Sequence, residues 1–215
     1  MTYLQLVNSV LRRLREDQVA TVEQNSYSQL IGELVNEAKE TVENSWDWTG
    51  LRTTIVVPTV ASTSTYTITG SQNKLKILDV INDTGNVFMT ERGNSWMRNL
   101  FLNNTAPESQ PQYYNLKTLD ANGDNVLQVY PVPDKVYDLN FSVVQRTPYF
   151  TNDDDKLKVS TNAVILYAAA LASRERGETG GTAAAEQFAL ADRALSDAIA
   201  YDAAQHSDET IWTSV

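Results

Sequence analysis

The stretch that decides the fold is residues 160–204, STNAVILYAAALASRERGETGGTAAAEQFALADRALSDAIAYDAA. Apolar side chains recur in it three and four positions apart, on both sides of a glycine-rich break at residues 176–181. This spacing places an apolar stripe on one face of each of two helices, and glycine suits a helix end. The stretch therefore predicts an antiparallel helical hairpin, half of a bundle whose other half lies elsewhere in the chain. The stripe residues are Val164, Ala168, Leu171, Ala172, Phe188, Ala191, Leu195 and Ala198.

The other half of the bundle is expected near the N-terminus, where two further amphipathic helices are predicted. Thr2 and Gln5 match a T-x-x-Q capping box for the first helix. Ser26 or Ser28 can cap the second. The two apolar stripes are natural partners for the hairpin, and they consist of Leu4, Val7, Leu11 and Leu14, then Ile31, Leu34, Val35, Ala38 and Val42.

Between the two helical regions the sequence becomes rich in alternating β-branched residues, which predicts strands. Asn122-Gly123 is a strong turn signal inside an expected hairpin over 113–130, and residues 95–101 allow one or two helical turns. The remaining strands are expected at 53–58, 64–69, 75–81, 87–89 and 137–145.

The predicted fold class is α+β, a helical bundle from both chain ends with an inserted antiparallel β domain. Residues 1–50 are expected to form the N-terminal helical pair and residues 51–155 the inserted β domain. Residues 156–205 are expected to form the hairpin that completes the bundle, and residues 206–215 a C-terminal docking tail.

The composition excludes several classes of function. The chain has 215 residues, a formal net charge of −10, no cysteine and a single histidine, His206. An acidic chain is a poor ligand for phosphate backbones, and a chain without cysteine has no disulfide, thiolate metal site or thiol nucleophile. No apolar run approaches the length of a membrane span, and the first residues lack the pattern of a signal peptide. We therefore expect a protein assembled in the cytoplasm, without membrane contact.

Two acidic motifs resemble cation sites, and each has a simpler interpretation. The run that begins at Asp120 opens like a calcium loop, but Asn125 stands where that loop needs glycine and Pro131 where it needs glutamate. A hairpin turn explains it better. Asp153-Asp154-Asp155 is more typical of a solvated loop or an acidic run leading into a helix. No other motif carries catalysis, so we expect no enzyme, no catalytic residue, no metal and no cofactor.

Two groups of residues can be interpreted either as structural or as binding residues. Arg12, Arg13 and Arg15 lie off the apolar stripe of the first helix. They are a solvated face, or else they contact an acidic neighbouring subunit or DNA. Trp46 and Trp48 are expected as core anchors rather than as a ligand-stacking pair.

The C-terminal tail is too short to fold alone, and it carries two large apolar residues. Such residues need a receptor, either on the same chain or, as tryptophan anchors favour, on a partner protein. The predicted docking residues are Asp208, Glu209, Thr210, Ile211, Trp212 and Val215.

Four segments together resemble the head-to-tail adaptor (connector) proteins of tailed bacteriophages, the tail tubular protein A-like family. They are MTYLQLVN with LRRLRE at residues 1–16, the helix over 27–48 ending in Trp46-Asp47-Trp48, the strand LQVYPVP at 127–133, and the C-terminal hairpin with ETIW at 209–212.

This resemblance implies a structural virion protein of the neck, assembled in the host cytoplasm. Copies would form a ring, twelvefold in the usual case, that joins the portal protein to the tail nozzle or tail tube protein and surrounds exiting genomic DNA without binding its sequence. The tail would dock on the portal. An acidic lumen suits a conduit because it repels DNA. Subunit packing would fall on Arg12, Arg13, Arg15, Ala168, Leu171, Ala191 and Leu195.

A second hypothesis is a binding module. In it, Trp96, Tyr113 and Tyr114 of the β domain recognise carbohydrate or a host receptor. Exposed, coplanar rings would favour this hypothesis, and buried rings would count against it.

Overall fold

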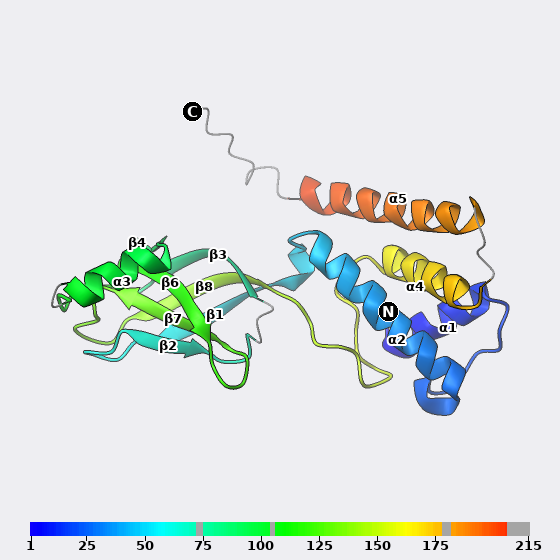
Figure 1. The fold of residues 1–215 in the computed structure, drawn as a ribbon, viewed down its shortest axis with the longest axis horizontal. Helices are drawn as coiled ribbons and strands as arrows, with labels where there is room; N and C mark the ends of the chain where they lie inside the picture. The colour runs from blue at the N-terminus through cyan, green and yellow to red at the C-terminus, as the bar shows by residue number, and fades with distance from the viewer. Residues whose placement is uncertain (72–74, 104–105, 178–181, 206–215) are drawn as a thin grey trace. The chain divides into compact units, whose positions relative to one another are not determined.

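The computed structural model describes residues 1–71, 75–103, 106–177 and 182–205. Within them the chain contains five α-helices and two mostly antiparallel sheets, which confirms the α+β class (Figure 1). The chain divides into two compact units. The helical unit contains Met1–Leu51 and Pro148–Val215, and the β unit contains Arg52–Thr147.

The first helix, α1, runs over Tyr3–Arg13, and its predicted capping box is confirmed. The Thr2 hydroxyl accepts from the Gln5 amide at 3.3 Å, and the Gln5 side chain accepts from the Thr2 amide at 3.1 Å. The buried face differs from the predicted stripe, since Leu4 and Leu14 are only half-buried. Because α1 packs against both α2 and α4, its buried face is wider than one stripe. Its fully or almost fully buried side chains include Leu6, Val7, Val10 and Leu11.

Helix α2 runs over Ser26–Ser45, and all five residues of its predicted stripe are buried. The predicted cap was wrong by one residue or more. Asn25 is the N-cap: its side chain accepts from the Ser28 amide at 2.7 Å, and the Ser28 hydroxyl accepts from the Asn25 amide at 3.2 Å. Ser28 is thus the third helical residue of a capping box, so it supports the cap from inside the helix.

The C-terminal pair consists of α4, Thr161–Glu175, and α5, Thr182–Ala204, which pack against each other. Helix α4 ends and α5 begins on either side of the predicted break, whose residues 178–181 lie outside the described part. The Tyr167 hydroxyl donates to the Asp192 carboxylate across the pair, and the Arg174 guanidinium lies 5.6 Å from the centre of the Phe188 ring. Helix α4 also packs against α1 and α2, so it is the central helix of the unit (Figure 1).

The β unit holds two four-stranded sheets among its described residues, in the orders β1-β8-β3-β4 and β2-β7-β6-β5. All strand pairs are antiparallel except β5 with β6, a departure from the prediction. Helix α3, Asn94–Asn103, contacts β6. The strands are β1 Arg52–Pro58, β2 Thr65–Ile68, β3 Leu75–Asn82, β4 Val87–Phe88, β5 Thr90–Glu91, β6 Tyr113–Leu119, β7 Asn125–Tyr130 and β8 Asp138–Gln145.

The core of the β unit is formed by alternate side chains of its strands. Leu139, Phe141 and Val143 of β8 are fully buried, as their period of two predicts. They join a cluster that also contains Ile68 and Leu127. The strand alternation in the sequence therefore located the buried face of this sheet.

The turn at Asp120 confirms the hairpin interpretation. The Asp120 carboxylate accepts from the amides of Asn122 at 2.8 Å and Asp124 at 2.9 Å. Gly123 adopts φ +84°, a conformation that favours glycine. The Asp124 carboxylate accepts from the Gly70 amide at 3.0 Å. The carboxylates of this loop are thus engaged with backbone donors.

Candidate functional site

The segment that follows the β unit, residues 148–155, is called the return segment. Polar side chains of α2 hold it in place. The Asn36 amide group bonds both backbone groups of Phe150, accepting from its N–H at 2.9 Å and donating to its carbonyl at 3.2 Å. Lys39 is almost fully buried: its ammonium donates to the Pro148 carbonyl at 2.6 Å and lies 4.6 Å from the centre of the Phe150 ring. Glu43, also buried, is 3.8 Å from that ammonium.

The acidic run at 153–155 fastens the same segment to α1 and to the turn before α2. The first amides of α1 donate to this run, Tyr3 to the Asp155 carbonyl at 2.8 Å and Leu4 to the Asp153 carbonyl at 3.1 Å. The Asp153 carboxylate accepts from the Val22 amide at 3.1 Å. Hydrogen bonds from the amides of Asn152 and Thr151 lower the pKa of Asp155. The carboxylates of Asp153 and Asp155 thus accept hydrogen bonds from backbone amides. The described residues contain no cluster of three or more side chains that could hold a metal ion.

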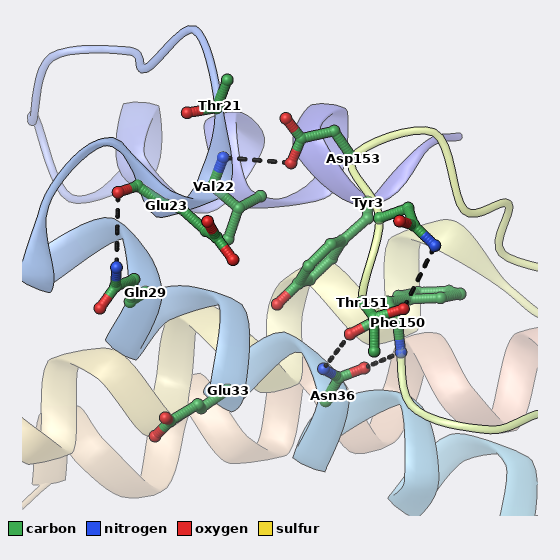
Figure 2. A pocket seen from close by; sticks show the side chains of 11 residues that line it. Tyr3, Thr21, Val22, Glu23, Gln29, Glu33, Asn36, Phe150, Thr151 and Asp153 are labelled. Atoms are coloured by element: carbon green, nitrogen blue, oxygen red, sulfur yellow. Dashed lines mark hydrogen bonds between the residues drawn. The ribbon is translucent and has the colours of Figure 1, made fainter.

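A groove of about 750 Å³ lies between α1, the short turn Val22–Gln24, α2 and the return segment (Figure 2). Three acids line it: Glu23, Glu33 and Asp153. In the described part of the chain, neither the Glu23 nor the Glu33 carboxylate has a hydrogen bond or an ion pair. Among the residues that the structure describes, no basic side chain lines the groove, so its charge is negative.

Tyr3 forms the aromatic wall of this groove. Its side chain is only 6% exposed, and its ring lies 5.4 Å from that of Phe150. Gly32 of α2 makes this position possible, because a Cβ atom there would lie 2.3 Å from the Tyr3 hydroxyl oxygen. The hydroxyl points into the groove (Figure 2), and among the described residues it has no hydrogen-bond partner. Burial, and next the negative charges of Glu33 and Asp153, raise the pKa of Tyr3 to about 12.

The predicted arginine cluster lies at the C-terminal end of α1. Arg12, Arg13 and Arg15 are all exposed. Arg12 donates to the Ser9 hydroxyl at 3.2 Å, whereas Arg13 and Arg15 have no acidic partner within the described part. Arg13 also lines a small cavity of about 160 Å³ that includes residues of α4 and α5. The cluster therefore presents uncompensated positive charge.

Arg15 is the first residue after the C-cap of α1, Leu14, a position that is often glycine. Its φ is +60°, and its amide donates to the Arg12 carbonyl at 3.2 Å. The next amide, that of Glu16, donates to the Leu11 carbonyl at 3.0 Å. This is a Schellman motif with arginine at the left-handed position, which costs roughly 1 kcal/mol relative to glycine.

The four hairpin residues predicted to pack between subunits have different surroundings. Ala168 and Ala191 are fully buried inside the chain. Leu171 and Leu195 are half-buried. While the helices keep this packing, the two alanines contact their own chain and only the two leucines retain exposed surface. Among the described side chains of α5, the large apolar ones that are exposed are Leu190 and Tyr201, which the sequence reasoning did not single out.

The two tryptophans after α2 differ from each other. Trp48 is buried, as predicted, and its indole donates to the Val42 carbonyl at 2.7 Å. Trp46 is 39% exposed, so its prediction as a core anchor was wrong. Its indole donates to the Asp202 carboxylate at 3.1 Å, and the same oxygen accepts from the Thr49 amide at 3.1 Å. Trp46 therefore fastens the end of α5 to the end of α2.

The aromatic residues of the second hypothesis do not form a flat platform. Trp96 is 39% exposed and Tyr113 is half-buried, and their rings meet edge to face at 66°. Tyr114 is buried in the core. The Arg92 guanidinium lies 5.4 Å from the Trp96 ring and 5.1 Å from the Tyr113 ring, so it covers part of the surface of both rings.

Sequence reasoning missed the groove and its residues Tyr3, Glu23, Glu33 and Asp153. One signal was present: Gly32 inside a strongly patterned helix costs about 1 kcal/mol relative to alanine, and such a glycine indicates close packing. The predicted tail residues 208–212 and 215 lie outside the described part. Among the described helices, none has the length and apolar character that a bilayer crossing requires.

Comparison with known proteins identifies the family. A search among curated proteins found no match. The model of the SU10 adaptor protein family matches residues 1–213, which is nearly the whole chain. The chain therefore belongs to the SU10 adaptor protein family, in agreement with its resemblance to phage head-to-tail adaptors and with a structural role in the virion.

Proposed function

We propose that copies of this chain form a ring in the virion neck, which joins the portal protein to the tail and surrounds the DNA exit channel. The observation that carries the proposal is the match to the adaptor family over residues 1–213. The net charge of −10 supports a conduit, because a negative lumen repels the phosphate backbone. The proposal assigns no catalytic step.

In this proposal the helices from both chain ends act as one bundle that packs subunit against subunit. The contacts of α4 with α1, α2 and α5 support this role. So do the uncompensated charges of Arg13 and Arg15 and the exposed Leu190, since closed rings use two different patches of one surface. The β unit, Arg52–Thr147, would face the tail nozzle or tail tube protein.

The tail, residues 206–215, would dock on the portal. Ile211 and Trp212 are the proposed apolar anchors, because tryptophan in a short segment typically gains its energy by filling a partner's pocket. Helix α5 ends at Ala204, immediately before this tail. The bonds from Trp46 and Thr49 to Asp202 hold that helix end, so the tail would start from a fixed point.

The test is the mass of the protein alone and with purified portal, by light scattering, together with electron micrographs of the virion neck. We expect a monomer or a loose oligomer alone and a ring on the portal. Deleting residues 207–215 is expected to abolish portal docking while the circular dichroism of the fold stays unchanged. Docking that survives the deletion would remove the tail from the mechanism, and a portal that never gains a ring would refute the proposal.

The binding-module hypothesis is the weaker alternative. It needed exposed, coplanar rings, whereas Trp96 and Tyr113 meet edge to face under Arg92. No specific observation therefore favours carbohydrate or receptor recognition by the β unit.

A further inference from the structure

We infer that the groove lined by Tyr3, Glu23 and Glu33 receives the arginine cluster, Arg12, Arg13 and Arg15, of a second copy of this chain. The inference rests on the proposed ring and names the two surfaces that would join one subunit to the next. A closed ring requires such a head-to-tail contact, in which one patch of a subunit meets a different patch of its neighbour.

The first reason is that both surfaces carry charge without compensation. In the described residues, the carboxylates of Glu23 and Glu33 have no basic partner, and the guanidinium groups of Arg13 and Arg15 have no acidic one. Matching patches of opposite charge steer association and fix its register. Both patches belong to the helical unit, so every copy offers one of each.

The second reason is the Tyr3 hydroxyl. Its side chain is nine-tenths buried, yet the hydroxyl points into the groove and has no partner among the described residues. Because this oxygen is not itself fully buried, it can be reached from the groove and can accept a hydrogen bond from a neighbouring molecule. A guanidinium donates up to five hydrogen bonds in one plane, so one arginine can reach a carboxylate and the hydroxyl oxygen together.

The groove size agrees with this occupant. About 750 Å³ is enough for one or two long side chains with their water. The arginine end also has a fixed shape, since the Schellman motif holds the backbone from Leu11 to Glu16. A strained residue in such a position indicates a use for its side chain, and here the residue at the glycine position is Arg15.

The chain offers a clean test because it has no cysteine. A Glu23→Cys variant, labelled with a benzophenone maleimide, is assembled on purified portal with unlabelled wild-type chain and illuminated, and the cross-linked peptides are identified by mass spectrometry. We expect the label to capture the peptide that contains residues 12–15 of a second copy. A Lys117→Cys variant, labelled on the exposed face of β6, is the matched control and is expected not to capture that peptide.

Each outcome decides one question. Capture of portal peptides, or of any other part of a second copy, while the ring mass is normal overturns this inference and leaves the proposed ring intact. Absence of any ring with wild-type chain overturns the proposed function itself. Equal capture of residues 12–15 by both labelled variants also overturns the inference.

A second variant separates assembly from folding. Arg15→Gly removes a charge and also relieves the left-handed backbone, so the isolated chain is expected to keep or raise its melting temperature. Ring formation on the portal is expected to need about tenfold more protein, as for the loss of one buried charge pair. Unchanged ring formation by both Arg15→Gly and Arg13→Glu would overturn the inference. A double reversal, Arg13→Glu with Glu33→Arg, is expected to restore part of the loss.

Discussion

The two units of this chain bury different chemistry. The centre of the β unit is an apolar cluster, with Phe141, Leu139 and Leu127 fully buried. The helical unit buries an ion pair between Lys39 and Glu43 beside its apolar stripes. The buried polar residues of the β unit are mostly uncharged. Some lie at turns, as Ser71 does in its bonds to Asn125, and others lie inside strands, as Asn115 of β6 and Gln128 of β7 do.

The difference follows from how each unit is assembled along the chain. The helical unit must hold a segment that is more than a hundred residues away from α2, as the bonds of Asn36 and Lys39 to Phe150 and Pro148 do. Side-chain bonds to backbone are directional, so they fix where that segment lies. An apolar core stabilises without fixing direction. We therefore expect apolar truncation to be costly in the core of either unit, and truncation of buried charged side chains to be most costly in the helical unit.

The largest effect is expected for Phe141→Ala. Removing a fully buried ring from a core costs about 3–5 kcal/mol. Urea unfolding combined with hydrogen exchange of the β8 amides should report this loss in the β unit. The matched control is Phe88→Ala, since Phe88 is 71% exposed and its truncation should stay within about 0.5 kcal/mol. A similar loss for both variants would contradict the description of the core.

The next effect is expected for Lys39→Met. Breaking a buried ion pair costs about 3 kcal/mol, because the remaining charge of Glu43 stays buried. Hydrogen exchange of the α2 amides should report the loss. The double variant Lys39→Met with Glu43→Leu is expected to recover most of it, because both charges are gone. A double variant as unstable as the single one would show that the ion pair is not the cause.

A smaller loss, about 2 kcal/mol, is expected for Asn36→Ala. The amide and carbonyl of Phe150 both lose their partner in a buried place. Denaturant unfolding followed by helical ellipticity measures it. Asn44→Ala, at an exposed position of the same helix, is the control and is expected to be nearly neutral. Equal effects of the two variants would show that the bonds of Asn36 to Phe150 do not stabilise the helical unit.

The smallest effect concerns alkaline pH. The pKa of Tyr3 is about 12 in the folded chain and 10.0 in its ordinary state. The folded state therefore holds its proton longer, so this contribution to stability is complete below pH 10 and is lost as the pH rises toward 12. Tyr3→Phe is expected to raise the pH midpoint of helix loss, measured by ellipticity at 222 nm, whereas Tyr201→Phe at an exposed site should not. Burial raises the pKa of Tyr114 to about 12 as well. The β unit is therefore also expected to lose stability between pH 10 and pH 12, and the Tyr3→Phe variant should not change that loss.

The sequence by itself determined the elements and the class. The capping box at Thr2, the stripe of α2, the alternation of β8 and the turn at Asp120 were all predictable, because each depends on residues close together in the chain. The adaptor family was recognisable for a similar reason, since its segments keep their order and spacing. The inter-subunit and tail residues remain predictions.

Only the tertiary structure decided which polar groups meet. The groove joins Tyr3, Glu23, Glu33 and Asp153, which come from distant segments of the chain. Val22 and Asp153, which share a hydrogen bond, are 131 positions apart. The local spacing of residues in the sequence does not predict contacts between such distant segments. The structure also buried Ala168 and Ala191 and left Trp46 exposed, because burial depends on which helices pack together. Local patterns fix which face of an element is apolar, whereas the partner of a charge is fixed only when distant segments fold together.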